Sequence, residues 1–167
     1  MWAAVAVMLV PSPDSLLLIR RARREGDPWS GHMALPGGRC DPQDSDLIAT
    51  VIREVGEEVG ISLERGQLIT ALDDVVPQHP TLPPVAVRPH LFLLPARPSL
   101  TLNLEVSEAV WVPLDRLLSS QTFQSVQIET STGPRDFPAY RLGSGVVWGM
   151  TERILTALLD EIRRQES

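Results

Sequence analysis

The segment from Leu47 to Val59, LIATVIREVGEEV, constrains the fold more than any other stretch of this chain. Its apolar residues recur at the three- and four-residue spacing of an α-helix, so on a helix they share one face: Leu47, Ile48, Val51, Ile52, Val55 and Val59. We therefore expect a helix over 47–59 with this face against a core. Asp44 or Ser45 is the expected N-cap, and Gly60 suits the left-handed position that ends a helix.

Three glutamates form a second stripe on the same helix. Glu54, Glu57 and Glu58 share an arc of about 100° beside the apolar face. Like charges at this spacing destabilise a helix by about a few tenths of a kcal/mol, so solvent or a cation must compensate for them. Carboxylate oxygens are ligands that suit Mg²⁺ or Mn²⁺, and the glycine turn at 37–38 lets a backbone carbonyl approach closely. An acidic, solvated helix surface is the alternative.

The remaining pattern favours strands over helices. Period-two alternation and the turn signals Pro-Ser-Pro-Asp predict a hairpin of strands 2–10 and 15–21. Further strands are expected at 68–76, 85–94, 109–112, 125–129 and 137–142, with a short helix in PLDRLLSS and a long amphipathic one over 146–164. Helices in the middle and at the end of such a series predict an α/β fold, an α/β/α sandwich with a mixed β-sheet. At 167 residues, the simplest organisation is a single domain spanning 1–167.

Charge and composition exclude several classes of function. The formal net charge of -6 argues against a general nucleic-acid binder. Fifteen arginines and no lysine exclude Schiff-base, P-loop-lysine and Ser-Lys chemistry, while arginine remains a good bidentate phosphate ligand. No apolar run reaches the eighteen or so residues of a membrane helix. The N-terminal segment reads as a strand, not a signal peptide, and the single cysteine, Cys40, allows no internal disulfide, so we expect a cytoplasmic protein.

The stretch LPGGRCDPQDSDLIATVIREVGEEVGI resembles the Nudix box, written G-x5-E-x7-R-E-U-x-E-E-x-G-U with U aliphatic. Gly37 and Gly38 match its start. The fixed positions of its second half are all matched, by Arg53, Glu54, Val55, Glu57, Glu58, Gly60 and Ile61. The resemblance implies a single Nudix hydrolase domain with the Nudix-type α/β/α sandwich.

The chain departs from the box at one point. From Gly38 to Arg53 the spacing is one residue longer than the box allows, and Ser45 falls where the box has its middle glutamate. Either Asp44 or Asp46 could stand in for that carboxylate. The variant PGG-x-x-D-P-x-D-x-D…R-E resembles a Nudix subgroup that hydrolyses coenzyme A, as do EVSEAVWVPLDRL and PAYRLGSGVVWGMTERIL downstream.

The resemblance implies hydrolysis of a nucleoside diphosphate linked to another group, X. Mg²⁺ or Mn²⁺ held by Glu54, Glu57, Glu58 and the Gly37 carbonyl would neutralise the pyrophosphate and activate a water. Arg53 would pair with a neighbouring glutamate and hold it in its ligating rotamer. Glu54, Glu57 and Arg53 are therefore the candidate catalytic residues, and Glu54 is also one candidate for the general base.

Outside the box, two loop carboxylates and three arginines are candidates. Glu105 and Glu108 are alternatives to Glu54 as general base, because some Nudix enzymes place the base outside the helix. Arg20, Arg21 and Arg39 are the candidate phosphate contacts. Trp29 could stack on a base, although packing is its more ordinary role.

The resemblance implies CoA or acyl-CoA as the favoured small-molecule nucleotide substrate, and charge and hydropathy argue against a nucleic-acid or membrane partner. A nucleotide sugar, dinucleotide or nucleoside triphosphate is the alternative within the same chemistry. A non-catalytic nucleotide-binding Nudix module is a third possibility, against which the three retained glutamates argue. The oligomeric state is open, and a homodimer is compatible with the sequence.

Overall fold

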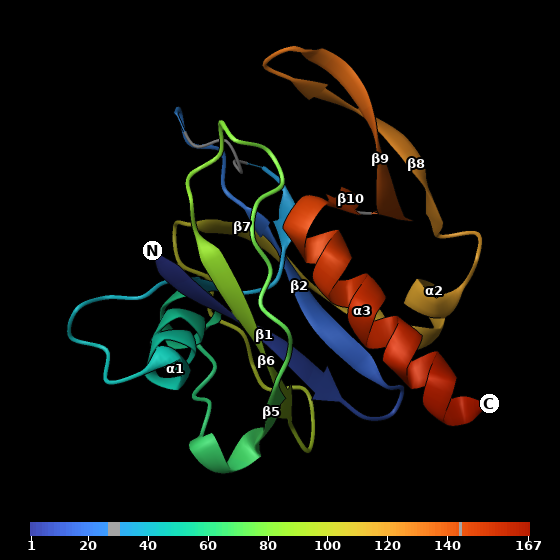
Figure 1. Cartoon of the computed structure of the whole chain (residues 1–167). Coiled ribbons are helices and arrows are strands. Elements are labelled where there is room, and N and C mark those ends of the chain that lie inside the picture. Colours follow the sequence, from blue (N-terminus) through green and yellow to red (C-terminus); the bar gives the residue numbers. More distant parts are fainter. Residues whose placement is uncertain (27–30, 144) are drawn as a thin grey trace.

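The protein is described here by a computed structural model that covers residues 1–26, 31–143 and 145–167. In this part of the chain the elements are β1 (Trp2–Val10), β2 (Ser15–Arg21), β3 (Met33–Ala34), β4 (Gly37–Arg39), α1 (Leu47–Val59), a 3₁₀ turn (Arg65–Gln67), β5 (Leu68–Ala71), β6 (Ala86–Leu93), β7 (Val106–Pro113), α2 (Leu114–Leu118), β8 (Phe123–Thr130), β9 (Gly133–Leu142), β10 (Gly145–Trp148) and α3 (Gly149–Glu166). Strands β1 to β7 form one mixed sheet, and β8 to β10 form a second, three-stranded one (Figure 1).

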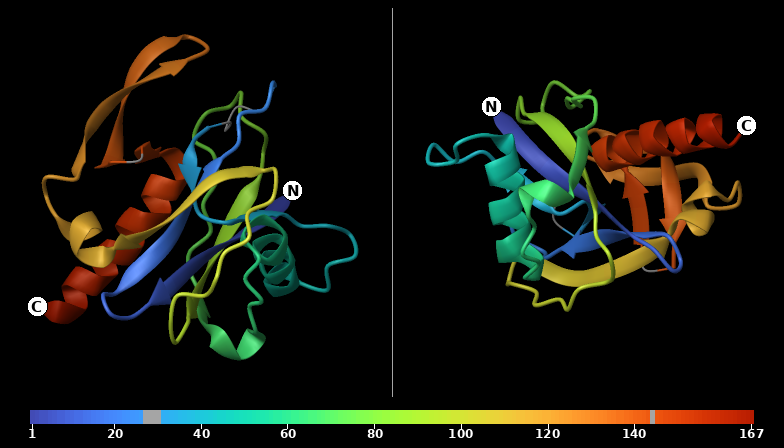
Figure 2. Two further views of the ribbon diagram at one scale, coloured as in Figure 1. Left: turned by 180° about the vertical axis from the view of Figure 1, so that it is seen from behind. Right: turned by 90° about the horizontal axis from the view of Figure 1, so that it is seen from below.

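Two hydrophobic cores cover the two faces of the larger sheet. Alternate residues of β1 pack on opposite sides: Ala4, Ala6 and Met8 lie with the apolar face of α1, and Ala3 and Val7 lie with that of α3. The helices therefore lie on opposite faces of the sheet, as both views in Figure 2 show. The predicted α/β/α sandwich with a mixed sheet is confirmed, with β1 parallel to β6 and antiparallel to β2.

The first two strands form a hairpin that stays paired only near its turn. Their registered pairs are Leu9 with Leu16 and Val10 with Ser15. Beyond these pairs the strands separate, and β4 runs antiparallel to the first half of β1, with Gly38 opposite Ala4. This separation brings the Gly-Gly segment into the sheet directly beside α1, which contacts β4.

The second sheet differs most from the sequence prediction. The helix expected from Val146 begins at Gly149, because Val146 and Val147 belong to β10, which pairs with β9. Strands β8 and β9 are longer than predicted and form a hairpin whose outer end projects from the rest of the molecule (Figure 1). In the main sheet, β5 ends at Ala71 instead of Val76, and β7 begins at Val106 instead of Ala109.

Helix α1 has the predicted bounds and a different N-cap. The cap is Asp46, whose carboxylate accepts a hydrogen bond from the Ala49 backbone N–H at 2.7 Å. The predicted caps, Asp44 and Ser45, were wrong because the helix begins at Leu47, so the capping position is the residue immediately before it, Asp46. Gly60 ends the helix in the left-handed conformation, φ 74°, as expected.

Candidate active site

Glu54 of α1 lies directly against the backbone of Gly38 in β4. A Cβ atom added at Gly38 would lie 2.4 Å from the Glu54 Cδ and 2.6 Å from its Oε1. No side chain can occupy that space while Glu54 keeps its position, so glycine is required here for steric reasons. Gly37 is similarly restricted, because a Cβ there would lie 2.2 Å from the Ala4 carbonyl oxygen and φ is +153°.

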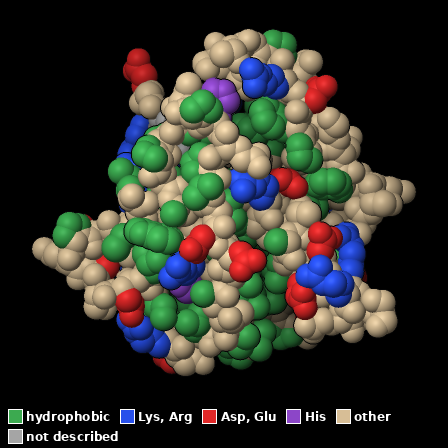
Figure 3. Space-filling view, viewed as in Figure 1, with side chains coloured by type: hydrophobic (Ala, Val, Ile, Leu, Met, Phe, Trp, Pro, Cys, Tyr) green, Lys and Arg blue, Asp and Glu red, His purple; other side chains and the backbone are tan. Residues whose placement is uncertain are grey.

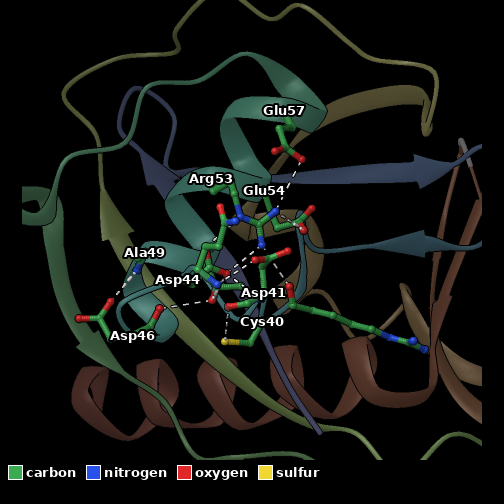
Figure 4. A network of polar contacts seen from close by, with 11 residues as sticks. Cys40, Asp41, Asp44, Asp46, Ala49, Arg53, Glu54 and Glu57 are labelled. Carbon is green, nitrogen blue, oxygen red and sulfur yellow. Dashed lines mark hydrogen bonds and ion pairs between the residues drawn. The ribbon is translucent and has the colours of Figure 1, made fainter.

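Arg53 links the segment between β4 and α1 to Glu54 of α1, and Figure 4 shows it between Asp44 and Glu54. Its Nε and Nη2 donate to the two carboxylate oxygens of Asp44 at 3.0 and 2.9 Å. Its Nη1 donates to Glu54 Oε1 at 2.8 Å and lies 3.7 Å from Glu57 Oε2. Nη2 also donates to the Arg39 carbonyl at 3.2 Å. One guanidinium therefore fixes the Glu54 carboxylate relative to the turn, and the hydrogen bonds with Asp44 raise the pKa of Arg53 further.

Asp44, and not Asp46, is the aspartate that contacts Arg53. Its side chain is 7% exposed and accepts hydrogen bonds from the Thr50 hydroxyl and the Asp41 backbone N–H, each at 2.8 Å, besides those from Arg53. These donors hold the pKa of Asp44 well below its usual range, with the Arg53 hydrogen bond as the largest cause. Asp46 instead caps α1 and pairs with Arg65. The sequence did not decide between Asp44 and Asp46 as the replacement for the middle glutamate. In the structure it is the Asp44 side chain that reaches Arg53.

Glu58 is the most buried carboxylate of the group. The residue is 3% exposed and accepts a hydrogen bond from the Gly37 backbone N–H. Burial, together with the negative charges of Glu54 and Glu105, raises its pKa to about 8, although the positive charge of Arg21 and the Gly37 hydrogen bond act in the opposite direction. Burial likewise raises the pKa of Glu54. The neighbouring carboxylates therefore repel one another in a poorly solvated place, which an added cation would relieve.

The three box glutamates lie on one side of α1 without surrounding a single point. Glu57 is the outermost, with a side chain that is 57% exposed. Within residues 1–26, 31–143 and 145–167, no three His, Cys, Asp or Glu side chains are arranged to hold a metal ion. The bond between Arg53 and Glu54 keeps that carboxylate turned toward the guanidinium, so a shared ion requires rotamer changes along the helix.

The loop carboxylates lie on different sides of the main sheet. Glu105, the residue before β7, contributes to the raised pKa values of Glu54 and Glu58, so it lies near the acidic face of α1. It lines a small pocket together with Arg21, Ala22 and Arg24. Its backbone carbonyl accepts a hydrogen bond from Ala22 N–H at 2.8 Å, which joins this loop to the end of β2.

Glu108 lies with Arg20 instead. The two residues are registered partners across β2 and β7, and Arg20 Nε donates to Glu108 Oε2 at 3.3 Å. Arg20 also donates to the Gly31 carbonyl at 3.3 Å and crowds Gly145 of β10. Alternation along β2 puts Arg20 on the α3 face and Arg21 on the α1 face, so of these two candidates only Arg21 lies beside Glu58.

The other candidates of the sequence are at the periphery. The Arg39 side chain is exposed at the end of β4, and its backbone carbonyl accepts from Arg53. Trp29 lies outside the described residues. On the face in Figure 3, arginines lie beside acidic side chains and do not gather into a basic patch. Among the described residues, no helix is long and apolar enough to cross a membrane.

Comparison with known proteins identifies the family. The family model described as NUDIX domain matches residues 2–131. A protein of Schizosaccharomyces pombe is 40% identical over 127 residues, which are 73% of this chain and 39% of that protein, so the chain spans well under half of that relative. An uncharacterized Nudix hydrolase, NudL, of Photorhabdus laumondii is 30% identical over 96% of this chain and 84% of its own length.

Solved structures show the same fold. The Nudix domain of Shewanella oneidensis NrtR, solved with ADP ribose, aligns with a TM-score of 0.58 at 23% identity, covering 71% of this chain and 75% of that one. A MutT/nudix family protein from Enterococcus faecalis aligns with a TM-score of 0.65 at 18% identity, covering 92% of this chain and 58% of that one. The fold and the acidic helix beside the glycine turn are those of a Nudix hydrolase. The chain belongs to the NUDIX domain family.

Proposed function

We propose that this protein hydrolyses a nucleoside diphosphate linked to a group X in a reaction that depends on Mg²⁺ or Mn²⁺, with CoA or acyl-CoA as the favoured substrate. The observation that carries the proposal is the Glu54 carboxylate fixed between Gly38 and Arg53, with buried Glu58 beside it. Poorly solvated carboxylates this close together repel one another, and a divalent cation would relieve that repulsion, whereas the carboxylates of a merely solvated acidic helix have no such need.

Glu54, Glu57, Glu58 and the Gly37 carbonyl are the groups that would hold the ion. Their ligand atoms are all oxygens, which suits Mg²⁺ or Mn²⁺. When bound, such an ion neutralises phosphate charge and lowers the pKa of a coordinated water. Arg53 acts as a positioning residue, because it orients Glu54 and is itself held by Asp44.

Glu105 is the proposed general base. It lies near Glu54 and Glu58 and shares a pocket with Arg21, whereas Glu108 is paired with Arg20 on the other side of the sheet. In the step proposed, a water oxygen forms a bond to one phosphorus and its proton passes to the Glu105 carboxylate. The bond from that phosphorus to the bridging oxygen breaks, and the leaving phosphate keeps the electron pair. Arg21 stabilises the charge on the phosphates.

The preference for CoA rests on the resemblance of PGG-x-x-D-P-x-D-x-D, of EVSEAVWVPLDRL and of the segment around Trp148 to one subgroup of the family. Arg20 and Arg39 are candidates for the 3′-phosphate of CoA, since that group needs a cation and this chain offers only arginine. ADP-ribose is the principal alternative, because the NrtR domain of the same fold was solved with it.

A hydrolysis panel tests the proposal. CoA, 3′-dephospho-CoA, ADP-ribose, NADH, a dinucleoside polyphosphate and a nucleoside triphosphate are incubated with Mg²⁺ or Mn²⁺, and products are identified by mass spectrometry. We expect the pyrophosphate of CoA to be cleaved with the highest kcat/KM, and no cleavage in chelator. Cleavage of ADP-ribose as fast as CoA would refute the CoA preference. If no substrate is cleaved, the proposed hydrolase activity is refuted.

A further inference from the structure

The outer edge of β8 is open for pairing with another strand. In the described part of the chain the second sheet has the order β10-β9-β8, so β8 has a neighbour on one side only. It is eight residues long, FQSVQIET, with one charged residue, Glu129. Soluble proteins usually blunt such an edge with charges, prolines, bulges or a covering segment, because unpaired N–H and C=O groups recruit other strands.

The prolines of β9 identify which β8 groups face outward. Ser125 is registered with Pro138, and Glu129 with Pro134. A proline has no N–H, so these cannot be the pairs of an antiparallel ladder that exchange both hydrogen bonds. The bond from Arg141 N–H to the Thr122 carbonyl, at 2.8 Å, agrees with this alternation. The outward N–H and C=O groups of β8 therefore belong to the exposed residues Phe123, Ser125, Gln127 and Glu129.

The opposite edge of the same hairpin is blocked. Beyond the residues of β9 that pair with β10, the groups that face away from β8 belong to Pro134, Asp136 and Pro138. Two of these have no N–H and the third carries a charge, which are two of the ordinary devices against edge pairing. The hairpin is thus protected along β9 and unprotected along β8.

We propose that β8 pairs antiparallel with β8 of a second copy of this chain, which joins the two three-stranded sheets into one. The pairing has its two-fold axis at Val126. Phe123 then lies opposite the partner copy's position 129, and Ser125 opposite position 127, so each outward-facing residue exchanges both of its hydrogen bonds. The axis also keeps Glu129 away from its own symmetry mate, which avoids like charges in register.

A second copy fits better than a foreign peptide for two reasons. The edge is neutral except at Glu129, so it offers no charge pattern that would select a different partner. Its outward N–H and C=O groups come from every second residue, and a two-fold axis at Val126 places those of one copy opposite those of the other. The hairpin also projects from the rest of the molecule, which leaves it accessible to a second copy (Figures 1 and 2).

Sedimentation equilibrium of the full chain tests the pairing, with Gln127→Pro and the control Gln127→Ala. The Gln127 N–H faces outward, so proline there removes no bond of the β8–β9 ladder. It removes one bond from each copy of the proposed dimer, which should raise the dissociation constant about 5- to 150-fold. We expect dimers for the wild type and Gln127→Ala, and monomers for Gln127→Pro with an unchanged far-UV circular dichroism spectrum.

Disulfide cross-linking tests the register and does not depend on the proline variant. In a Cys40→Ser background, Val126→Cys should cross-link two copies, because residues on the axis have Cα atoms about 4.5 Å apart. Gln124→Cys is the control: it is the more exposed position, but its symmetry mate lies four residues along the strand, about 13 Å away, too far for a disulfide. A monomeric wild type, a dimer that folded Gln127→Pro leaves intact, or cross-linking at 124 and not at 126 would overturn the proposal.

Discussion

The carboxylate of Glu54 and the backbone of Gly38 are packed so tightly that a single methyl group cannot be inserted between them. The contact joins α1 to β4, two elements whose juxtaposition depends on the early separation of β1 and β2. It gives a steric reason for glycine at this strand position, where glycine is otherwise unfavourable, because any side chain would displace the Glu54 carboxylate. It also makes the position of Glu54 sensitive to a residue that has no functional group of its own.

Gly38→Ala should therefore reduce activity strongly. The added Cβ would lie 2.4 Å from the Glu54 Cδ and must displace that carboxylate. A misplacement of about 1 Å in an active site can cost about 100-fold in rate, which is the loss we expect in kcat. The control is Gly56→Ala on α1, where the nearest atom would be 3.8 Å away and alanine favours the helix. Steady-state kinetics and thermal unfolding distinguish the two, and full activity of Gly38→Ala would contradict the role given to this contact.

Asp44→Asn should weaken both the fold and the reaction. The change removes the charge that receives two hydrogen bonds from Arg53, at an expected cost of about 1–3 kcal/mol in the free energy of unfolding. Because Arg53 then orients Glu54 less well, kcat/KM should fall as well. Asp46→Asn is the matched control, since asparagine caps a helix as well as aspartate does. Urea denaturation measures the first effect; equal stability of the two variants would show that Asp44 is an ordinary surface residue.

Glu58 should make the metal-free protein less stable as pH rises. Its pKa is about 8 in the folded protein against an ordinary 4.5, so folding favours the protonated form. The stabilisation is fully present below pH 4.5 and is lost as the pH rises through about 8, a change of up to a few kcal/mol. Glu58→Gln should remove this dependence and stabilise the protein at high pH, while abolishing most activity.

Glu57→Gln serves as the comparison for Glu58→Gln. Its side chain is more than half exposed, so the substitution should leave the unfolding midpoint nearly unchanged while still reducing activity. Both measurements are made by thermal unfolding in chelator across the pH range. A large loss of stability in either variant would assign the glutamates to the fold and not to the reaction.

Glu105→Gln and Glu108→Gln separate the two loop carboxylates. If Glu105 is the general base, its substitution should lower kcat by about 100- to 10,000-fold with little change in KM. Glu108 is paired with Arg20 away from α1, so Glu108→Gln should leave kcat nearly unchanged in the same steady-state assay. The opposite result, with kcat lowered only by Glu108→Gln, would exchange the two roles.

The sequence predicted the elements whose patterns are local. The bounds of β1, β2 and α1 were correct to the residue, because their alternation and helical periodicity end at clear turn residues such as Gly60. The start of α3 was wrong because Val146 and Val147 fit a helical apolar pattern, and only the pairing with β9 makes them a strand. A local pattern does not report pairing between distant segments.

The candidate site divides in the same way. The box motif supplied Glu54, Glu57, Glu58, Arg53 and Gly37 because they are close in sequence. Which arginine and which loop carboxylate lie near them depends on side-chain alternation across β2 and β7, with its irregularity between Arg20 and Arg21. The partner of Arg53 depends on the path of a turn one residue longer than the pattern, and only the structure identifies Asp44.

The most direct test of the central claim is Mn²⁺ binding, measured by electron paramagnetic resonance on the wild type and on Glu58→Gln. Glu58 is buried and Glu54 lies against Gly38 of β4, so we expect the wild type to bind Mn²⁺ and Mg²⁺ to displace it. Glu58→Gln, which keeps the shape of the side chain and removes its charge, should weaken binding by at least about tenfold, equivalent to about 1.4 kcal/mol. Equal binding by the two proteins, or none by the wild type, would contradict the claim that these glutamates form a metal site.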